Sequence, residues 1–297
     1  MITTNNRSSD LRQTLFEIAK LNPQPNEILI CADGCTDGTT GMLQSEFPHC
    51  KVMTNQLRRG SIYSRDVLLR TASSDIVVSL DDDSYPMDRD FLPHLVRIFV
   101  AHPDAGVITF VELRGEKGEF SGPAADLKSG RFVAAYPNCA AAMRREVYLK
   151  SDGFPVFFGH MYEEPDYALQ CYALGFGVWF EPTLRVRHYL ASSRDDQMPR
   201  HHLQARNEVW SVWLRCPLPW VLVMTIYRVA RQFLFAALQG FGWAMREPYW
   251  WKMAVCNLRQ VIKNRRAVSS RIYFGWLRLG RKPEGSARDL SRIFGDC

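Results

Sequence analysis

The sequence predicts an α/β protein with a mostly parallel central sheet flanked by helices, followed by a C-terminal helical extension. Short β-branched runs alternate with helical segments up to residue 113. Three adjacent aspartates follow one of these runs, and the chain becomes basic and aromatic after about residue 190. Alternating strands and helices build a parallel sheet with helices on its faces. We therefore expect a first domain over residues 1–190 and a helical, membrane-associated region over residues 191–297.

Each predicted element rests on its own pattern. Strands are expected where a short apolar or alternating run is bounded by polar residues, and these runs span residues 27–32, 51–53, 74–80, 105–113 and 183–187. Helices are expected where apolar residues recur at helical spacing, and these segments span residues 39–47, 61–72, 89–101 and 167–174. Residues 191–200 are polar and predict a loop.

Charge is unevenly divided along the chain. The formal net charge is +6, yet residues 1–188 hold 19 basic and 24 acidic side chains, whereas residues 189–297 hold 18 basic and 7 acidic ones. A basic tail suits anionic lipid, nucleic acid or water, and we expect a membrane surface and no nucleic acid. The eight scattered cysteines lack zinc-site spacing and predict buried free thiols in a reducing compartment. The first residues do not have the pattern of a signal peptide.

The C-terminal region is expected to lie in the membrane interface. Residues 218–243 are strongly apolar but include Arg228 and Arg231. A spanning helix needs about 20 mainly apolar residues, and each arginine at mid-span would cost roughly 2.5–3.5 kcal/mol. Interfacial helices with aromatic and basic side chains at the headgroups avoid that cost. This predicts a cytoplasmic protein, peripheral on the inner face of the cell membrane. The alternative is a helical cap on the core or a dimer contact.

The three aspartates lie where a cation is expected. Asp81, Asp82 and Asp83 follow the strand predicted over residues 74–80, and open α/β sheets bind ligands at the carboxyl ends of their strands. Alternate residues of an extended chain point the same way, so Asp81 and Asp83 can share one Mg²⁺ or Mn²⁺ ion that holds a substrate phosphate, with Asp82 turned aside. The alternative is a solvated acidic turn.

Further polar segments extend this prediction. Asp33 directly follows the strand predicted over residues 27–32 and can accept a hydrogen bond from a nucleobase. Gly60 and Arg65 lie at and just inside a helix start, which suits phosphate. Each of these segments also fits an ordinary turn or a solvated helix end.

Two more acidic or titratable positions follow. Glu163 and Glu164 precede the helix predicted over residues 167–174, and an acid on such a loop, Glu164 above all, is placed as a general base. The neighbouring Asp166 fits an acid that stabilises the helix start. His188 follows the strand predicted over residues 183–187 and suits a structural role better than a metal ligand.

Four motifs, taken in order, resemble those of family 2 glycosyltransferases, which have the GT-A fold. The resemblance covers roughly residues 1–190. The motifs are Thr3-Thr4-Asn5-Asn6-Arg7-Ser8, similar to the loop after the first strand; Asp33-Gly34-Cys35-Thr36-Asp37-Gly38-Thr39, similar to D-G-S-T-D-G-T; Leu80-Asp81-Asp82-Asp83, similar to D-x-D; and Gly153-Phe154 with Glu163-Glu164-Pro165-Asp166, similar to G-F…E-D/E-x-D.

The resemblance implies a hexosyltransferase that moves one sugar, with inversion, from a nucleotide-diphosphate sugar to an acceptor hydroxyl. Its setting would be polysaccharide or cell-surface glycan assembly, with a glycan or lipid-linked acceptor. Glu164 would be the base and Glu163 its alternative. Mg²⁺ or Mn²⁺ would bind Asp83, Asp81 and His188. The nucleotide sugar would bind Thr3, Thr4, Asn6, Arg7, Asp33, Gly60, Arg65, Asp81 and Asp82.

The sequence departs from the family pattern in places. Ala32 stands where an acid is common, and only Ile2-Thr3-Thr4 remain of the usual apolar first strand. These departures leave open a catalytically impaired nucleotide-sugar-binding or membrane-associated interaction protein. A nucleotidyltransferase would carry a Gly-rich phosphate loop, which the first thirty residues lack. The absence of a Q-x-x-R-W motif favours single-sugar transfer. The role of Arg206-Asn207 is open between a helix start and acceptor binding.

Overall fold

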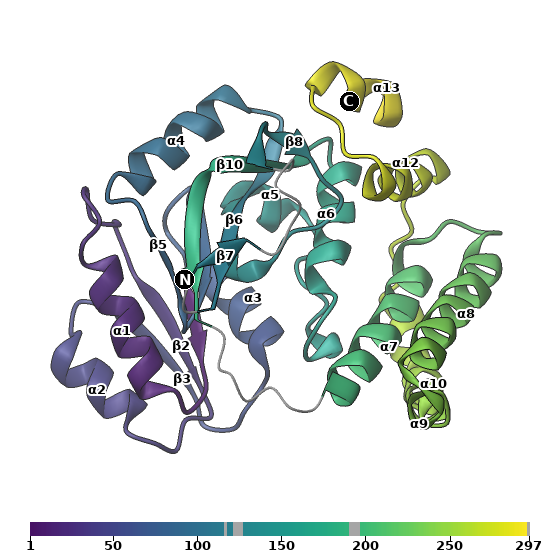
Figure 1. Cartoon of the computed structure of the whole chain (residues 1–297), viewed down its shortest axis with the longest axis horizontal. Helices are drawn as coiled ribbons and strands as arrows, with labels where there is room; N and C mark the ends of the chain where they lie inside the picture. Colours follow the sequence, from purple (N-terminus) through teal and green to yellow (C-terminus); the bar gives the residue numbers. More distant parts are fainter. Residues whose placement is uncertain (116–117, 121–126, 190–196, 296–297) are drawn as a thin grey trace.

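The computed structural model describes residues 1–115, 118–120, 127–189 and 197–295. One large sheet forms its centre (Figure 1). Helices α1 (Ser8–Ile18), α2 (Thr39–Glu46) and α4 (Phe91–Ala101) lie on one side of the sheet, and α3 (Ser61–Thr71), α5 (Arg145–Lys150) and α6 (Glu163–Ala173) lie on the other. This arrangement confirms the predicted α/β fold class.

The sheet has the strand order β3-β2-β1-β4-β9-β6-β10-β5. Strands β3, β2, β1 and β4 run parallel, β9 is antiparallel to both β4 and β6, and β6 and β10 are parallel. The strands are β1 (Ile2–Thr4), β2 (Leu29–Asp33), β3 (Lys51–Asn55), β4 (Ile76–Asp81), β5 (Ser84–Pro86), β6 (Ala105–Arg114), β7 (Glu119–Phe120), β8 (Arg131–Phe132), β9 (Ala141–Arg144) and β10 (Gly177–His188).

Strand β1 is short, as the sequence predicts, but it lies in the middle of the sheet. Ile2 pairs with Ile30 of β2 and with Leu80 of β4, both in parallel register. Parallel strands end at the same edge of a sheet. The carboxyl ends of β1, β2 and β4 therefore bring Thr4, Asp33 and the start of the aspartate run to one place.

Within residues 1–190, three helices differ from the sequence prediction, and one of them, α5, has no predicted counterpart. Helix α1 was not expected either, although Leu11, Leu15 and Ile18 recur at helical spacing and are buried against the sheet. Helix α6 begins at Glu163, four residues before the predicted start at residue 167, so Glu163 and Glu164 lie in its first turn and not on a loop. Asp166 lies in the first turn of this helix, as predicted, and it is also buried and paired with Arg215.

The C-terminal region is helical, as predicted. Its helices are α7 (Gln197–Arg215), α8 (Val221–Gln239), α9 (Phe241–Ala244), α10 (Glu247–Cys256), α11 (Leu258–Lys263), α12 (Ser270–Arg281) and α13 (Ala287–Phe294). The loop predicted over residues 191–200 is wrong for residues 197–200, which form the first turn of α7. Residues 191–196 lie outside the described part of the chain.

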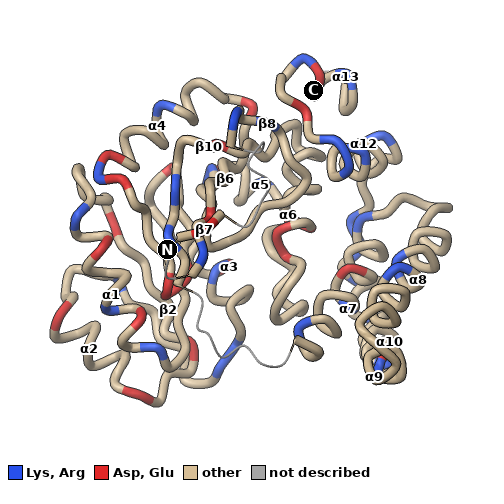
Figure 2. The backbone as a smooth tube through the Cα atoms, in the orientation of Figure 1, with Lys and Arg blue, Asp and Glu red and all other residues tan. Residues whose placement is uncertain are grey.

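Helix α8 has two contrasting faces. By length and composition alone, it is the one helix among the described residues that is long and apolar enough to cross a membrane. Its buried residues Met224, Arg228, Gln232 and Ala236 recur at helical spacing. Arg228 and Arg231 both pair with Glu208 of α7, so the arginines that interrupt the apolar stretch are held by protein. Figure 2 shows further basic residues, all arginines, on α12.

Candidate active site

A large cavity lies at the sheet edge where β1, β2 and β4 end. Its volume is about 1410 Å³, above the range of roughly 300–1,000 Å³ that is common for small-molecule sites. Its wall is built from the strand ends, from residues 58–61, 135–139 and 159–165, and from the first turns of α7. The cavity is therefore larger than a typical pocket for one small molecule.

The aspartate cluster (Asp81, Asp82 and Asp83) is tied to the chain next to β1. Arg7 donates to Asp82 Oδ1 at 2.7 Å and to Asp83 Oδ2 at 2.8 Å. Thr4 Oγ1 donates to Asp82 Oδ2 at 2.8 Å. Asp82 and Asp83 are buried, whereas Asp81 is partly exposed to the cavity. Asp82 and Asp83 thus both bind Arg7 of the N-terminal loop. The structure differs here from the predicted division, in which Asp81 and Asp83 share a cation and Asp82 alone turns aside, because Asp81 and Asp82 line the cavity and Asp83 does not.

The surroundings move the pKa values of two aspartates in opposite directions. Burial raises the pKa of Asp82 to about 7, although Arg7 and Thr4 oppose the rise. Burial would also raise the pKa of Asp83, but hydrogen bonds from His188 and Arg7 outweigh it and lower that pKa. The cations around the cluster therefore keep Asp83 ionised at neutral pH.

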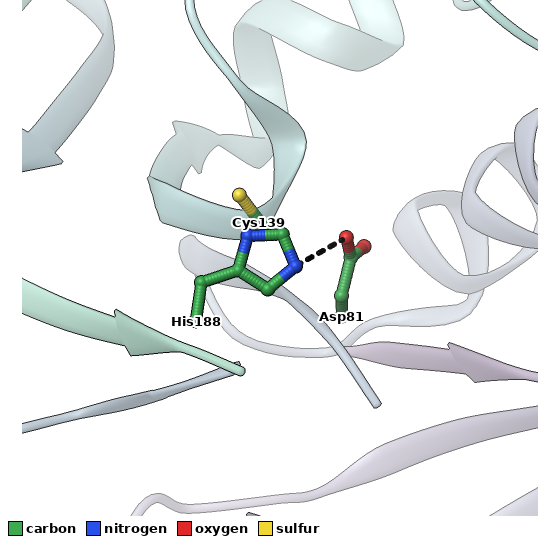
Figure 3. A group of neighbouring side chains, drawn as sticks. All are labelled: Asp81, Cys139 and His188. Atoms are coloured by element: carbon green, nitrogen blue, oxygen red, sulfur yellow. Dashed lines mark ion pairs between the residues drawn. The ribbon is translucent and has the colours of Figure 1, made fainter. Parts of the chain in front are cut away.

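Asp81, Cys139 and His188 form a group that can hold a metal ion (Figure 3). The ligand atoms of these three side chains all lie within 4.8 Å of one another. His188 Nε2 lies 3.7 Å from Asp81 Oδ2 and 3.1 Å from Asp83 Oδ1. Its other ring nitrogen, Nδ1, is hydrogen-bonded to Glu112, so His188 is oriented as metal-bound histidines usually are.

The donor set decides which ion fits. Carboxylate oxygen and imidazole nitrogen suit Mg²⁺ or Mn²⁺, and thiolate sulfur suits softer metals. Burial, together with the charges of Asp81 and Glu112, raises the pKa of Cys139 well above its ordinary value. Burial lowers the pKa of His188, but hydrogen bonds to Asp83 and Glu112 outweigh it and raise that pKa to about 9, so a cation that binds here must displace the protons of both side chains. Asp81 and His188 fit a hard divalent cation that completes its coordination with substrate oxygens.

The glutamate pair (Glu163 and Glu164) lines the cavity from the first turn of α6. Glu163 is buried and accepts from Asn138 Nδ2 at 3.0 Å, and its carboxylate lies 3.8 Å from Arg65. Glu164 accepts a long hydrogen bond of 3.4 Å from the backbone N–H of Asn138. Arg65 also forms an ion pair with Asp81, so one arginine links the two acidic groups.

The glutamate pair has a higher affinity for protons than ordinary carboxylates. Burial raises the pKa of Glu164, and the nearby charge of Glu163 raises it further. Burial also raises the pKa of Glu163, although Arg65 opposes this. A carboxylate with a raised pKa at a cavity wall is suited to accept a proton from a substrate.

The loops predicted to bind a nucleotide are joined to one another by hydrogen bonds from backbone N–H groups to their side chains. Asp33 accepts from the backbone N–H groups of Arg59 and Gly60, both at 2.8 Å. Asn6 Oδ1 accepts from the N–H of Thr36 at 2.7 Å. Asp33 thus fixes the turn at Gly60, whose φ of 95° suits glycine, and Asn6 fixes the loop before α2.

The structure brings most of the predicted site residues to this one cavity. Asn6 and Asp83 are the two that do not line it. Sequence reasoning missed Asn138, Cys139 and Glu112, which contact the glutamate pair or His188. No local motif marks these three residues, because each gains its place from strands β6 and β9 packing between β4 and β10.

Comparisons with known proteins agree with this geometry. Residues 1–160 match the family model described as glycosyl transferase family 2. No curated protein matches the chain. Solved structures of glycosyltransferases share its GT-A fold. One is the mannosyltransferase PcManGT from Pyrobaculum calidifontis, solved with GDP-Man and Mn²⁺, at 19% identity and a TM-score of 0.56, covering 95% of this chain and 86% of that one.

A second similar structure is S. aureus TarS 1-349 in complex with UDP-GlcNAc. It is 16% identical, has a TM-score of 0.63, and the match covers 99% of this chain and 88% of that chain. At this level of identity the likeness shows the fold. The match extends over the C-terminal helices of this chain as well as its sheet.

Proposed function

The chain belongs to glycosyl transferase family 2 and is a glycosyltransferase, and we propose that it moves one sugar, with inversion, from a nucleotide-diphosphate sugar to an acceptor hydroxyl. The observation that carries this proposal is a single cavity with a candidate cation site on one side and a desolvated glutamate pair on the other. These two groups supply the two functions that glycosyl transfer needs, which are stabilisation of the leaving group and removal of a proton.

The donor occupies the half of the cavity near the strand ends. Thr3, Thr4 and Asp33 line the nucleoside side, and Arg58 and Arg59 offer cations to the diphosphate. Asp81 and His188 would hold Mg²⁺ or Mn²⁺, which neutralises charge that develops on the diphosphate as it leaves. The complexes of PcManGT with GDP-Man and Mn²⁺ and of TarS with UDP-GlcNAc support a donor of this class.

The acceptor occupies the half of the cavity next to α6 and α7. Glu164 accepts the proton of the acceptor hydroxyl as its oxygen bonds to the anomeric carbon and the bond to the diphosphate breaks. Glu163 is the alternative base. One-step inversion needs no covalent enzyme nucleophile, and a carboxylate whose pKa is raised takes the proton more readily. Glycans or lipid-linked sugars in cell-surface polysaccharide assembly are the proposed acceptors.

Calorimetry with a panel of donors tests the proposal. Folded protein should bind at least one of UDP-, GDP- or dTDP-sugars in the presence of Mn²⁺ or Mg²⁺, and EDTA should abolish that binding. Mass spectrometry should then detect release of the sugar to water or to an acceptor. Failure to bind any donor would contradict the enzymatic function. Binding without any turnover would favour the catalytically impaired binding protein.

We also propose that the outer face of α8 binds the surface of the cell membrane from the cytoplasm. Leu222, Ile226 and Leu238 on this face are 64, 70 and 77% exposed, and contiguous exposed apolar side chains mark interaction sites. The opposite face of α8 packs on α7, and Arg228 of α8 forms a buried ion pair with Glu208 of α7. If α8 crossed the membrane, this ion pair would have to enter the hydrocarbon core. An in-plane helix avoids that transfer.

Charge on the helices that follow α8 favours an anionic membrane. Arg246, Lys252, Arg259 and Lys263 are all exposed, and a basic side chain near anionic lipid contributes about 1 kcal/mol. This sign of charge is more compatible with a lipid surface than with a second copy of the same basic helices. A membrane position also places the cavity near lipid-linked acceptors.

Vesicle co-sedimentation tests the membrane proposal. The full chain should bind vesicles that contain phosphatidylglycerol more tightly than vesicles of phosphatidylcholine alone. The combined change Leu222→Gln, Ile226→Gln and Leu238→Gln should release it. Val96→Gln with Val100→Gln is a matched control, because these α4 side chains are 50 and 76% exposed. Equal binding by both variants, or a monomeric wild type that binds neither vesicle, would overturn the proposal. A dimer that the α8 variant dissociates would assign the face to self-association.

A further inference from the structure

The segment before the glutamate pair has an unusual backbone. Residues Gly159, Met161 and Tyr162 have φ values of 74, 75 and 73°, and Tyr162 directly precedes Glu163 at the start of α6. Glycine adopts this left-handed conformation freely, but Met161 and Tyr162 do not. Two adjacent side-chain-bearing residues keep such φ values only when surrounding contacts hold them there.

Two neighbouring residues of α7 supply those contacts. Asn207 Nδ2 donates to the backbone carbonyls of His160 and Met161, both at 2.8 Å, and lies 3.3 Å from that of Phe158. Arg206 Nη2 donates to the same Phe158 carbonyl at 2.6 Å. Asn207 is fully buried and Arg206 nearly so. These bonds join α7 to the segment about 46 residues earlier in the chain.

Arg206 also fixes the direction in which Asn207 points. Its Nε donates to Asn207 Oδ1 at 2.9 Å, so the amide must turn its Nδ2 toward the carbonyls. The guanidinium lies 4.2 Å from the centre of the Trp210 ring. No carboxylate forms an ion pair with Arg206 within the described ranges of the chain. Its donors are therefore directed at the Asn207 amide oxygen and the Phe158 carbonyl, and its charge lies over an aromatic face.

The segment held in this way faces the cavity on two sides. Gly159, His160 and Met161 line the cavity wall next to the glutamate pair. On the other side, a Cβ atom at Gly60 would lie 2.7 Å from the carbonyl oxygen of Gly159. The backbone around Gly159 thus packs against the turn at Gly60 on the donor side while it leads into Glu163 on the acceptor side.

We propose that Arg206 and Asn207 are positioning residues. Together, as the Arg206–Asn207 clamp, they hold residues 158–162 in the one backbone conformation that presents Glu163 and Glu164 to the acceptor. This inference rests on the proposed function, because it gives the clamp a role only if a glutamate of the pair accepts the proton. Neither residue of the clamp lines the cavity. The clamp acts through residues 158–162. This role fits the place of Arg206 and Asn207 in the middle of α7, since neither residue lies at the start of the helix.

A second tie between α6 and α7 provides the matched control. Ser211 of α7 donates to Asp166 Oδ1 at 2.9 Å, and Arg215 pairs with Asp166 as well. Ser211 is buried, lies one turn from Asn207 on the same helix, and does not contact residues 158–162 among the hydrogen bonds of the described residues. Ser211→Ala therefore weakens the packing of α7 on α6 without loosening the clamp.

The test compares three variants of the full chain. Asn207→Leu keeps the size of the side chain but removes its donors, Asn207→Gln keeps the donors on a longer stem, and Ser211→Ala is the control. Asn207→Leu should lower kcat by about 10- to 100-fold, because displacement of a reacting group by about 1 Å has an effect of that order. Its KM for the donor should stay within about twofold, because Asp33 also holds the turn at Gly60 through the N–H groups of Arg59 and Gly60. Asn207→Gln should recover part of the loss.

Hydrogen exchange measures how firmly the clamp holds residues 158–162, independently of enzyme activity. In Asn207→Leu the amides of residues 160–164 should exchange faster than in wild type and in Ser211→Ala. Faster exchange together with lower kcat supports the proposal. Unchanged exchange, faster exchange with unchanged kcat, or equal kcat losses in Asn207→Leu and Ser211→Ala would overturn it. A wild type that turns over no donor would contradict the proposed function, whereas the exchange rates would still report whether the clamp holds its segment.

Discussion

The aspartate cluster, through Asp81 and Asp82, and the glutamate pair line the same cavity, but their charges are balanced differently. Arg7 binds Asp82 and Asp83, and His188 lies within 3.1 Å of Asp83. Among the described residues, Arg65 is the cation that acts on both glutamates of the pair, at 3.8 Å from Glu163. The pKa of Asp83 is lowered by its partners, whereas burial and mutual repulsion raise the pKa of Glu164.

This difference separates two chemical tasks. An ionised carboxylate next to a histidine is suited to binding a metal cation, since opposite charges stabilise one another at short range. A carboxylate whose pKa is raised by burial is suited to proton transfer, because it takes up a proton more readily than an ordinary carboxylate. Both groups consist of carboxylates, so the side chains that surround each group determine which of the two tasks it can perform.

The substitution Glu164→Gln should give the largest effect, because it removes the base but keeps the shape of the side chain. Positioned bases contribute roughly 10²–10⁴-fold, so the rate of sugar transfer should fall by that factor. Donor affinity should stay within about twofold. Single-turnover kinetics and calorimetry measure the two quantities separately.

Glu163→Gln is the control for this variant. A smaller loss in Glu163→Gln keeps Glu164 as the base, whereas a larger loss would move that role to Glu163. Equal losses of donor binding and of transfer in Glu164→Gln would show that the glutamate pair does not differ in task from the aspartate cluster.

The substitution Glu112→Gln tests the other side of the comparison. Glu112 holds His188 Nδ1, and removing such a partner of a metal-binding histidine lowers metal affinity by about 10- to 100-fold. Titration of Mn²⁺ followed by electron paramagnetic resonance should show this loss. Glu181→Gln is matched to it, because Glu181 is a buried glutamate that bonds Trp179 and Thr183 instead. Equal Mn²⁺ affinity in both variants would contradict a metal role for His188.

The strand ends of this site could be predicted from the sequence, and the contacts between distant segments could not. Asp33 and Asp81 each follow an apolar run, so their place at the sheet edge depends on local pattern. Cys139 precedes the short strand β9, whose Ala141 and Ala142 are small and carry little strand preference. Its approach to His188 requires β9 and β10 to flank β6, which no local motif encodes.

The C-terminal helices show the same limit. Their apolar and basic character could be predicted from composition, but the contribution of α7 to the cavity could not. Arg200 and Leu203 line the cavity beside the glutamate pair, and Asn207 bonds a segment near residue 160. These contacts depend on how α7 packs against α6, because a helix with several buried polar residues gives no sequence signal for the partner it faces.

The pH dependence of transfer gives the smallest and most discriminating effect. Glu164 must be ionised to accept a proton, and its pKa is raised from 4.5 by burial and by Glu163. The value of kcat/KM should therefore fall as pH decreases through the raised pKa, by about tenfold per unit below it, at a pH well above 4.5.

Glu163→Gln removes the repelling charge, so the pKa of Glu164 should fall and the acid limb should move to lower pH. Asp82, whose pKa is also raised, lies next to Arg7 on the other side of the cavity and should be unaffected. An acid limb that stays in place in Glu163→Gln would assign it to the aspartate cluster and remove the distinction between the two groups.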